Sequence, residues 1–323
     1  MARLTRRRFV ATSGALVALP ALAPQPLDAR GQVADVGELR VDKDIVFGMG
    51  GSKALTLDVY RPPAGTTAKR TAIVHLFAGG FAAGSKDANY IVNDVKALGT
   101  RGYTSVAANY RLAREGPWPA QIHDAKAAVR WTRANATRLG VEPNRIVVAG
   151  YGAGGLLALL AAGTAGRAEF EGEIGTPGVS SQVNACIGVY PLTTPENAAA
   201  LFAPGQATRE NLTAASPATY ISKDFAPTIF IHGTDDATVP VQSSVDFWSK
   251  LHALGVPAAL NLVQGADGAF DTAALDAVEM MAHAIDLFLD RLLVNRAPYP
   301  KFGGRGRGQG GRGAPPLAER GAN

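Results

Sequence analysis

Short runs of apolar, β-branched residues alternate with stretches of helical periodicity along most of this chain, and this alternation constrains the fold most. Successive strands separated by helices are joined by right-handed crossovers, which makes most of a sheet parallel. The predicted strands are 44–47, 55–60, 71–77, 103–108, 145–149, 183–189, 228–232 and 258–263. The predicted helices are 88–98, 119–139, 153–162, 241–254 and 273–294.

The predicted fold class is therefore α/β, with a mostly parallel eight-stranded sheet and helices on both faces. Gly50-Gly51 between the first two strands indicates a hairpin, so that pair is expected to be antiparallel. The segment 171–182 is rich in Gly, Pro and Ser and is expected to be a loop. Active sites of such sheets lie at the carboxyl ends of the strands.

Composition and charge narrow the class of protein. With 323 residues, of which 47% are hydrophobic, the chain can form one large domain or two small ones. The single cysteine, Cys186, excludes an internal disulfide and a Cys-based metal cluster. Residues 1–30 and 300–323 each carry a net charge of +4, which leaves −3 on residues 31–299. A nucleic-acid-binding core would have the opposite sign, so we expect no nucleic-acid partner.

The two ends differ in composition from the chain between them. Residues 1–30 begin with Arg6-Arg7-Arg8-Phe9 and continue with a short apolar stretch, the pattern of a twin-arginine-like export signal. We expect the twin-arginine export machinery as a partner and a periplasmic or secreted location in a bacterium. The alternative is a basic tail followed by a short apolar helix. No apolar run reaches 18 residues, so no stable membrane span is expected.

The Gly/Arg-rich segment 300–323 contains too little apolar surface to offset its ordering entropy. It is expected to be a disordered, solvated tail, with an arm that binds an anionic surface as the alternative. The domain that folds is expected over 31–299.

Four stretches of this domain, in the right order, resemble the esterase/lipase branch of the α/β-hydrolase superfamily. The resemblance is to bacterial feruloyl and acetyl esterase-like proteins and to hormone-sensitive-lipase-like proteins. The four stretches are Phe77–Ser85, Asn109–Asp124, Ala149–Gly155 and His232–Pro240. The resemblance covers roughly residues 40–294 and implies an α/β-hydrolase fold.

The sequence departs from the family at its catalytic positions. The family has its nucleophilic Ser on a strained turn between two glycines, and here that position is Gly152. The family's His stands in a Gly-x-Gly-His-Gly-Phe-like segment, where this chain has Gly268. The acid of the triad is retained as Asp236. The oxyanion loop begins Phe77-Ala78 in place of His-Gly.

The resemblance also implies which residues form the pocket. Backbone N–H groups at Gly80 and Ala153 would polarise a carbonyl. The predicted oxyanion and ligand pocket consists of Phe77, Ala78, Gly79, Gly80, Phe81, Tyr151, Ala153 and Asp267. Tyr151 is a candidate proton donor, and Asp267 is a turn residue or a group that faces the pocket. No metal or other cofactor is expected.

No other residue completes the triad. A serine nucleophile needs a base within hydrogen-bond reach, and that base needs an orienting carboxylate. His75 lies in a predicted strand and is expected to be a core histidine, while Ser85 is expected to support the oxyanion loop. The remaining histidines lie on predicted helices or open the acid loop: His123, His232, His252 and His283.

Three functions remain open at this point. The first is an exported pseudoenzyme that binds a small acyl, ester or aromatic ligand without turnover. The second is a repurposed lyase, isomerase or hydrolase that uses Asp236, Asp267 or Tyr151 in non-covalent acid–base catalysis. The third is a carboxylic-ester hydrolase, as the resemblance alone would suggest, although the nucleophile and base are missing.

Overall fold

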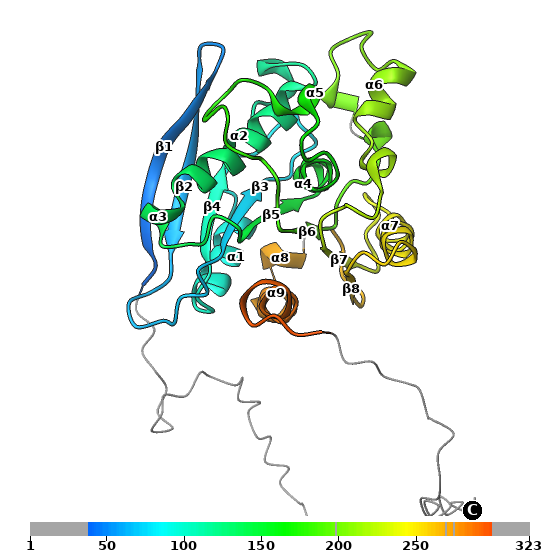
Figure 1. Ribbon diagram of the computed structural model, residues 1–323. Coiled ribbons are helices and arrows are strands. Elements are labelled where there is room, and N and C mark those ends of the chain that lie inside the picture. Colours follow the sequence, from blue (N-terminus) through cyan, green and yellow to red (C-terminus); the bar gives the residue numbers. More distant parts are fainter. Residues whose placement is uncertain (1–37, 198, 269, 274, 299–323) are drawn as a thin grey trace, which may run out of the picture. The chain divides into compact units, whose positions relative to one another are not determined.

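A computed structural model describes residues 38–298, apart from 198, 269 and 274 (Figure 1). The predicted export signal at 1–30 and the predicted tail at 300–323 lie outside these residues. Everything described below belongs to one compact unit of the chain.

The described residues form an eight-stranded sheet in the order β1-β2-β4-β3-β5-β6-β7-β8. β1 and β2 form the predicted antiparallel hairpin, β2 is also antiparallel to β4, and the remaining pairs are parallel. The predicted fold class is thus confirmed. The strands are β1 Arg40–Gly50, β2 Lys53–Arg61, β3 Ala72–Leu76, β4 Thr104–Ala108, β5 Ile146–Tyr151, β6 Ala185–Val189, β7 Thr228–Gly233 and β8 Ala258–Val263.

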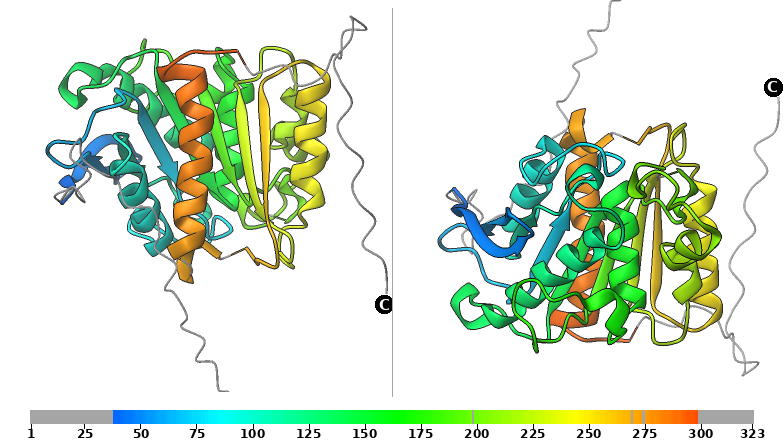
Figure 2. Two further views of the ribbon diagram at one scale, coloured as in Figure 1. Left: turned by 90° about the horizontal axis from the view of Figure 1, so that it is seen from below. Right: turned by 90° about the horizontal axis from the view of Figure 1, so that it is seen from above.

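Helices cover both faces of the sheet (Figure 2). α2 and α4 pack together on one face, while α1 and α9 pack together on the other, and α7 packs against β7 and β8. The strands β3 and β5 are completely buried, because strands between two helical layers have no solvent face. The helix α4 is also buried along nearly its whole length. The helices are α1 Asn89–Gly99, α2 Ala120–Ala134, α3 Ala136–Leu139, α4 Ala153–Gly163, α5 Ala168–Glu171, α6 Arg209–Ala214, α7 Gln242–Ala253, α8 Phe270–Ala273 and α9 Leu275–Leu289.

Two predicted helices differ from the observed ones. The helix predicted over 119–139 is divided at Asn135, whose φ of −99° and ψ of 12° leave the helical region, while its backbone N–H and its side-chain amide both donate to the carbonyl of Trp131. The last helix ends as α9 at Leu289 and continues as a wider turn over Asp290–Val294. Within the part of the chain that the structure describes, no helix has the length and apolar character that a membrane crossing requires.

Lys86 fixes the start of the sheet to the loop that follows β3. Its Nζ lies 2.9 Å from Asp58 Oδ1 and 3.0 Å from Asp44 Oδ1, and both Lys86 and Asp58 are buried. Its backbone N–H donates to Asn109 Oδ1 at 2.9 Å. A buried carboxylate without its cation destabilises the folded state, so Lys86 is needed opposite Asp58. Lys86 thereby holds the β1–β2 hairpin against the loop that follows β3.

We therefore expect Lys86→Met to lower the free energy of unfolding by about 3–5 kcal/mol, because Asp58 would remain buried without its cation. Lys43→Met removes an exposed lysine 4.0 Å from Asp87 and should cost less than about 1 kcal/mol. Urea unfolding of both variants tests this, and equal losses would contradict the role given to Lys86.

Candidate functional site

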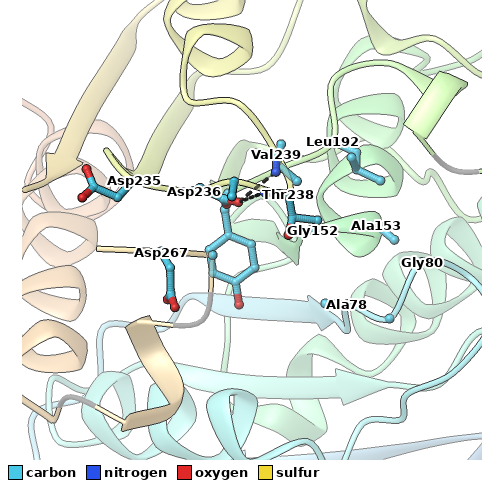
Figure 3. A pocket seen from close by; sticks show the side chains of 14 residues that line it. Ala78, Gly80, Gly152, Ala153, Leu192, Asp235, Asp236, Thr238, Val239 and Asp267 are labelled. Atoms are coloured by element: carbon cyan, nitrogen blue, oxygen red, sulfur yellow. Dashed lines mark hydrogen bonds between the residues drawn. The ribbon is translucent and has the colours of Figure 1, made fainter. Parts of the chain in front are cut away.

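A cavity of about 520 Å³ opens where β3, β5, β7 and β8 end (Figure 3). Its walls come from the four loops that follow these strands and from the residues that follow β6. It is lined by Ala78, Gly79, Gly80, Gly152, Ala153, Tyr190, Leu192, Asp235, Asp236, Ala237, Thr238, Val239, Asp267 and Gly268. These lining residues include no Ser, Cys, His, Lys or Arg.

The turn from β5 into α4 depends on glycines that tolerate no side chain. A Cβ on Gly150 would lie 2.1 Å from the carbonyl oxygen of Gly154, and one on Gly154 would lie 2.1 Å from that of Leu76. A carbon and an oxygen that are not bonded do not approach so closely, so positions 150 and 154 both require glycine. The turn packs the first residues of α4 directly onto the end of β3.

Gly152 lies at the apex of this turn and, unlike Gly150 and Gly154, is constrained by its backbone conformation rather than by close neighbours. Its φ of 49° and ψ of −111° lie in a region that L-residues adopt only with strain. Yet a Cβ there would meet only Ala78 Cβ at 3.4 Å and the Tyr190 ring at 3.8 Å, which is ordinary contact. The turn therefore has the strained shape of a nucleophile elbow and room for a side chain, but it presents none.

The loop after β3 is held in place by side chains behind it. Tyr110 donates its hydroxyl to the carbonyl of Phe77 at 2.7 Å, and the two rings stack with centroids 4.0 Å apart. The N–H of Ala78 donates to the hydroxyl of Tyr90 at 2.8 Å, so this N–H is not directed at the cavity. Gly79 and Gly80 have positive φ, which turns the loop across the N-terminus of α4. That helix end carries partial positive charge and favours an oxyanion or carbonyl oxygen.

Asp236 is the buried carboxylate of the cavity, with a side chain 1% exposed. Its Oδ1 accepts hydrogen bonds from the backbone N–H groups of Thr238 at 2.9 Å and Val239 at 2.8 Å (Figure 3). Its Oδ2 has no hydrogen-bond partner. A Cβ built on Gly268 would lie 2.6 Å from this Oδ2. Gly268 therefore packs directly against this carboxylate and, as the residues stand, has no room for a side chain.

His232 does not neutralise this oxygen. Its Nε2 lies 3.4 Å from Asp236 Oδ2, but it bonds to the carbonyl of Val239 at 2.9 Å and therefore carries its proton toward that acceptor. Nδ1 is paired with the hydroxyl of Ser244 at 2.8 Å. Burial lowers the pKa of His232, which keeps the ring neutral. The contact is a close approach of a neutral ring to a carboxylate rather than an ion pair.

The structure brings together most of the residues that the sequence suggested for the site. The predicted residues that line the cavity are Ala78, Gly79, Gly80, Gly152, Ala153, Asp236, Asp267 and Gly268. Phe77, Phe81 and Tyr151 do not line it, and the prediction was wrong for these three. Phe77 and Phe81 are buried against Tyr110, since aromatic packing behind the loop is their main contact.

Tyr151 belongs to a separate buried network below the cavity. Its hydroxyl donates to Asp94 Oδ2 at 2.5 Å and pairs with Nδ1 of His75 at 3.0 Å. His75 also pairs with Ser105 at 3.1 Å, and burial lowers its pKa to about 3. His75 is therefore a neutral core histidine, as expected. The other histidines do not line the cavity either: His123, His232, His252 and His283.

Tyr190, which directly follows β6 and lines the cavity, was not among the predicted site residues. Its hydroxyl donates to Asp271 at 2.8 Å to Oδ2 and 3.1 Å to Oδ1. Asp271 is fully buried, and this burial raises its pKa to about 6. Tyr190 could have been found from its place at a strand's carboxyl end, and its φ of 36° marks local strain. Nothing in the sequence indicated that Asp271 faces it.

No group of three His, Cys, Asp or Glu side chains in the described part of the chain is arranged to hold a metal ion. The lining residues supply backbone N–H groups near α4, carboxylates, and the hydroxyls of Thr238 and Tyr190, of which the Tyr190 hydroxyl is donated to buried Asp271.

Comparison with known proteins gives consistent matches. The sequence model of the BD-FAE family matches residues 57–251. Esterase LipC of Mycobacterium tuberculosis is 30% identical over 268 residues, which is 78% of this chain and 66% of LipC. Probable carboxylic ester hydrolase LipM of the same organism is 31% identical over 65% of this chain and 51% of LipM. The chain thus spans one half to two thirds of these relatives.

Among solved structures, esterase Est2 of Thermogutta terrifontis with bound propionate superposes with a TM-score of 0.65 at 28% identity. The match covers 80% of this chain and 97% of Est2. The same esterase has also been solved phosphorylated by paraoxon, and that structure matches with the same TM-score.

Proposed function

Because the chain belongs to the BD-FAE family of α/β-hydrolase esterases, we propose that it is a member that binds a small carbonyl compound without serine-type hydrolysis. One observation carries the proposal. The elbow turn is preserved in shape and in its flanking glycines, but Gly152 at its apex offers no nucleophile. The helix N-terminus beside it can still polarise a carbonyl oxygen.

The expected fall in turnover rate without a nucleophile and a base favours ligand binding over ester hydrolysis as the function. Removal of the nucleophile or base of such a triad costs roughly 10⁶-fold in turnover, because the two act as a unit. The residual acceleration from oxyanion donors and binding is on the order of 10³–10⁴ over water. Here both groups are missing, and no histidine lines the cavity that could activate Thr238 or Tyr190.

We expect the full chain to form no acyl-enzyme with p-nitrophenyl acetate and no adduct with paraoxon or a fluorophosphonate probe. Intact-mass spectrometry measures this directly, with Est2 of Thermogutta terrifontis as the positive control because it has been solved phosphorylated by paraoxon. A stoichiometric adduct on any residue of this chain would favour the ordinary ester-hydrolase function instead.

Tyr190 and Asp271 favour a second candidate function, non-covalent acid–base catalysis on the bound carbonyl compound. Tyr190 lines the cavity and is hydrogen-bonded to a buried carboxylate whose pKa is raised to about 6 by burial. A Tyr–Asp pair of this kind can pass a proton between a ligand and the carboxylate at neutral pH. Tyr151, which the sequence suggested for this role, is buried away from the cavity.

The second candidate predicts a characteristic pH dependence. Exchange of α-protons of a bound ketone, followed by NMR in D₂O, should rise as pH increases through about 6, because Asp271 must lose its proton to act as a base. Tyr190→Phe and Asp271→Asn should each abolish the exchange. Thr238→Val, which changes another hydroxyl of the cavity without touching this pair, is the matched control. Exchange that is absent in the parent, or unchanged in both variants, would exclude this function.

A further inference from the structure

Two carboxylates lie buried beneath the cavity without a positive charge beside them. Asp94 on α1 and Asp271 on α8 are both buried almost completely. Their hydrogen-bond partners are the uncharged hydroxyls of Tyr151 and Tyr190, and neither carboxylate forms an ion pair with a described residue. Asp94 Oδ1 has no hydrogen-bond partner. An ionised carboxylate is strongly destabilised by burial without a cation, so ionisation of both groups opposes this folded arrangement.

The two carboxylates belong to one cluster that joins α1 to α8. The two helices pack against each other (Figure 1), and the side-chain amide of Asn93 on α1 donates to the backbone carbonyl of Asp271 at 3.4 Å. The rings of Tyr151 and Tyr190 have centroids 6.5 Å apart. Burial raises the pKa of Asp94 well above its ordinary value, and the charge of Asp271 raises it further. The charge of one carboxylate therefore affects the ionisation of the other.

The other ionisable groups around this cluster supply no compensating positive charge. His75 in β3 pairs with the hydroxyl of Tyr151 but stays neutral, because burial lowers its pKa to about 3. Tyr90 on α1 accepts the N–H of Ala78 and is uncharged, because burial raises its pKa to about 12. Among charged groups on the neighbouring elements, Asp58 pairs with Lys86 and Asp286 with Lys69, while Lys96, Asp267, Asp276, Glu279 and His283 are exposed.

We propose that Asp94 and Asp271 form a proton-dependent latch, which keeps α8 and one wall of the cavity against α1 only while at least one of the two carboxyls is protonated. Asp267 and Gly268 line the cavity just before α8 begins at Phe270, so a shift of α8 moves this wall. α8 has four residues, whereas α1 has eleven and packs on β2 and β4, so α8 is the element that moves. The inference goes beyond the proposed function, because it holds whether the cavity binds or hydrolyses its ligand.

The direction of the pH dependence follows from a comparison of the closed and open positions of α8. In the open position both carboxyls are in water and titrate near their ordinary pKa of about 4. In the closed position burial raises the pKa of Asp271 to about 6 and that of Asp94 well above its ordinary value. The closed position therefore binds protons more tightly, and a rise in pH favours the open one. Each carboxyl lowers the ratio of closed to open molecules about tenfold per pH unit between its two pKa values, so above about pH 6 the effect comes from Asp94.

Amide hydrogen exchange of the full chain tests the latch, read by mass spectrometry on peptides that cover α8. The rates are expressed as protection factors, which remove the intrinsic effect of pH on exchange. In the parent, protection of α8 should fall about tenfold per pH unit from about pH 6 toward pH 8. Asp94→Asn keeps an acceptor for Tyr151 but cannot ionise, so its protection should stay level over this range. Asp246→Asn, which removes an exposed carboxylate on α7, should follow the parent. Protection of α4, on the opposite face of the sheet, should not change with pH in any of these proteins.

A second variant keeps Asp94 and changes only its hydrogen bond. Tyr151→Phe removes the donor that stabilises the ionised carboxyl, so the pKa of Asp94 should rise and the fall in protection should extend to higher pH. Level protection of α8 in the parent, an equal fall in folded Asp94→Asn, or a fall in α4 that matches the fall in α8 would overturn the inference. A Tyr151→Phe profile that coincides with that of the parent would do so as well.

Discussion

The site depends on the close approach of the first turn of α4 to the end of β3. Gly154 packs against the carbonyl oxygens of Leu76 and Phe77, and Gly150 packs against Gly154, at distances that leave no room for a Cβ. These contacts fix the turn and force Gly152 into its strained backbone conformation. They also hold the N-terminus of α4 against the loop after β3.

Gly152 and Gly268, which the resemblance aligns with the family's serine and histidine, differ in the room that their surroundings leave for a side chain. At Gly152 a side chain is missing from a position with room for it, and nothing else is disturbed. At Gly268 a Cβ would lie 2.6 Å from Asp236 Oδ2, so a side chain fits there only if the carboxylate moves. Asp236 Oδ2 is buried there without a hydrogen-bond partner.

The sequence predicted the sheet, its hairpin and the order of its elements, because apolar runs of strand length and glycine turns are local signals. It also predicted Asp236, Gly152 and Gly268 in one cavity, through the resemblance to esterases. The prediction of lining residues failed where it depends on which side of a strand or loop an aromatic side chain points to. Tyr151 and Phe77 are buried behind the site, and the bond between Tyr190 and Asp271 joins residues 81 positions apart. Such a contact leaves no trace in local periodicity.

The central claim is that a working esterase scaffold remains and that only two reactive groups are gone. The most direct measurement is hydrolysis of p-nitrophenyl acetate by the double variant Gly152→Ser plus Gly268→His, compared with both single variants. The serine would cost about 1–3 kcal/mol in backbone strain, and the histidine requires Asp236 to shift, because its Cβ starts 2.6 Å from Oδ2. We expect the folded double variant to hydrolyse the ester well above the parent, with both single variants near the parent's rate. A folded double variant no faster than the parent would contradict the claim.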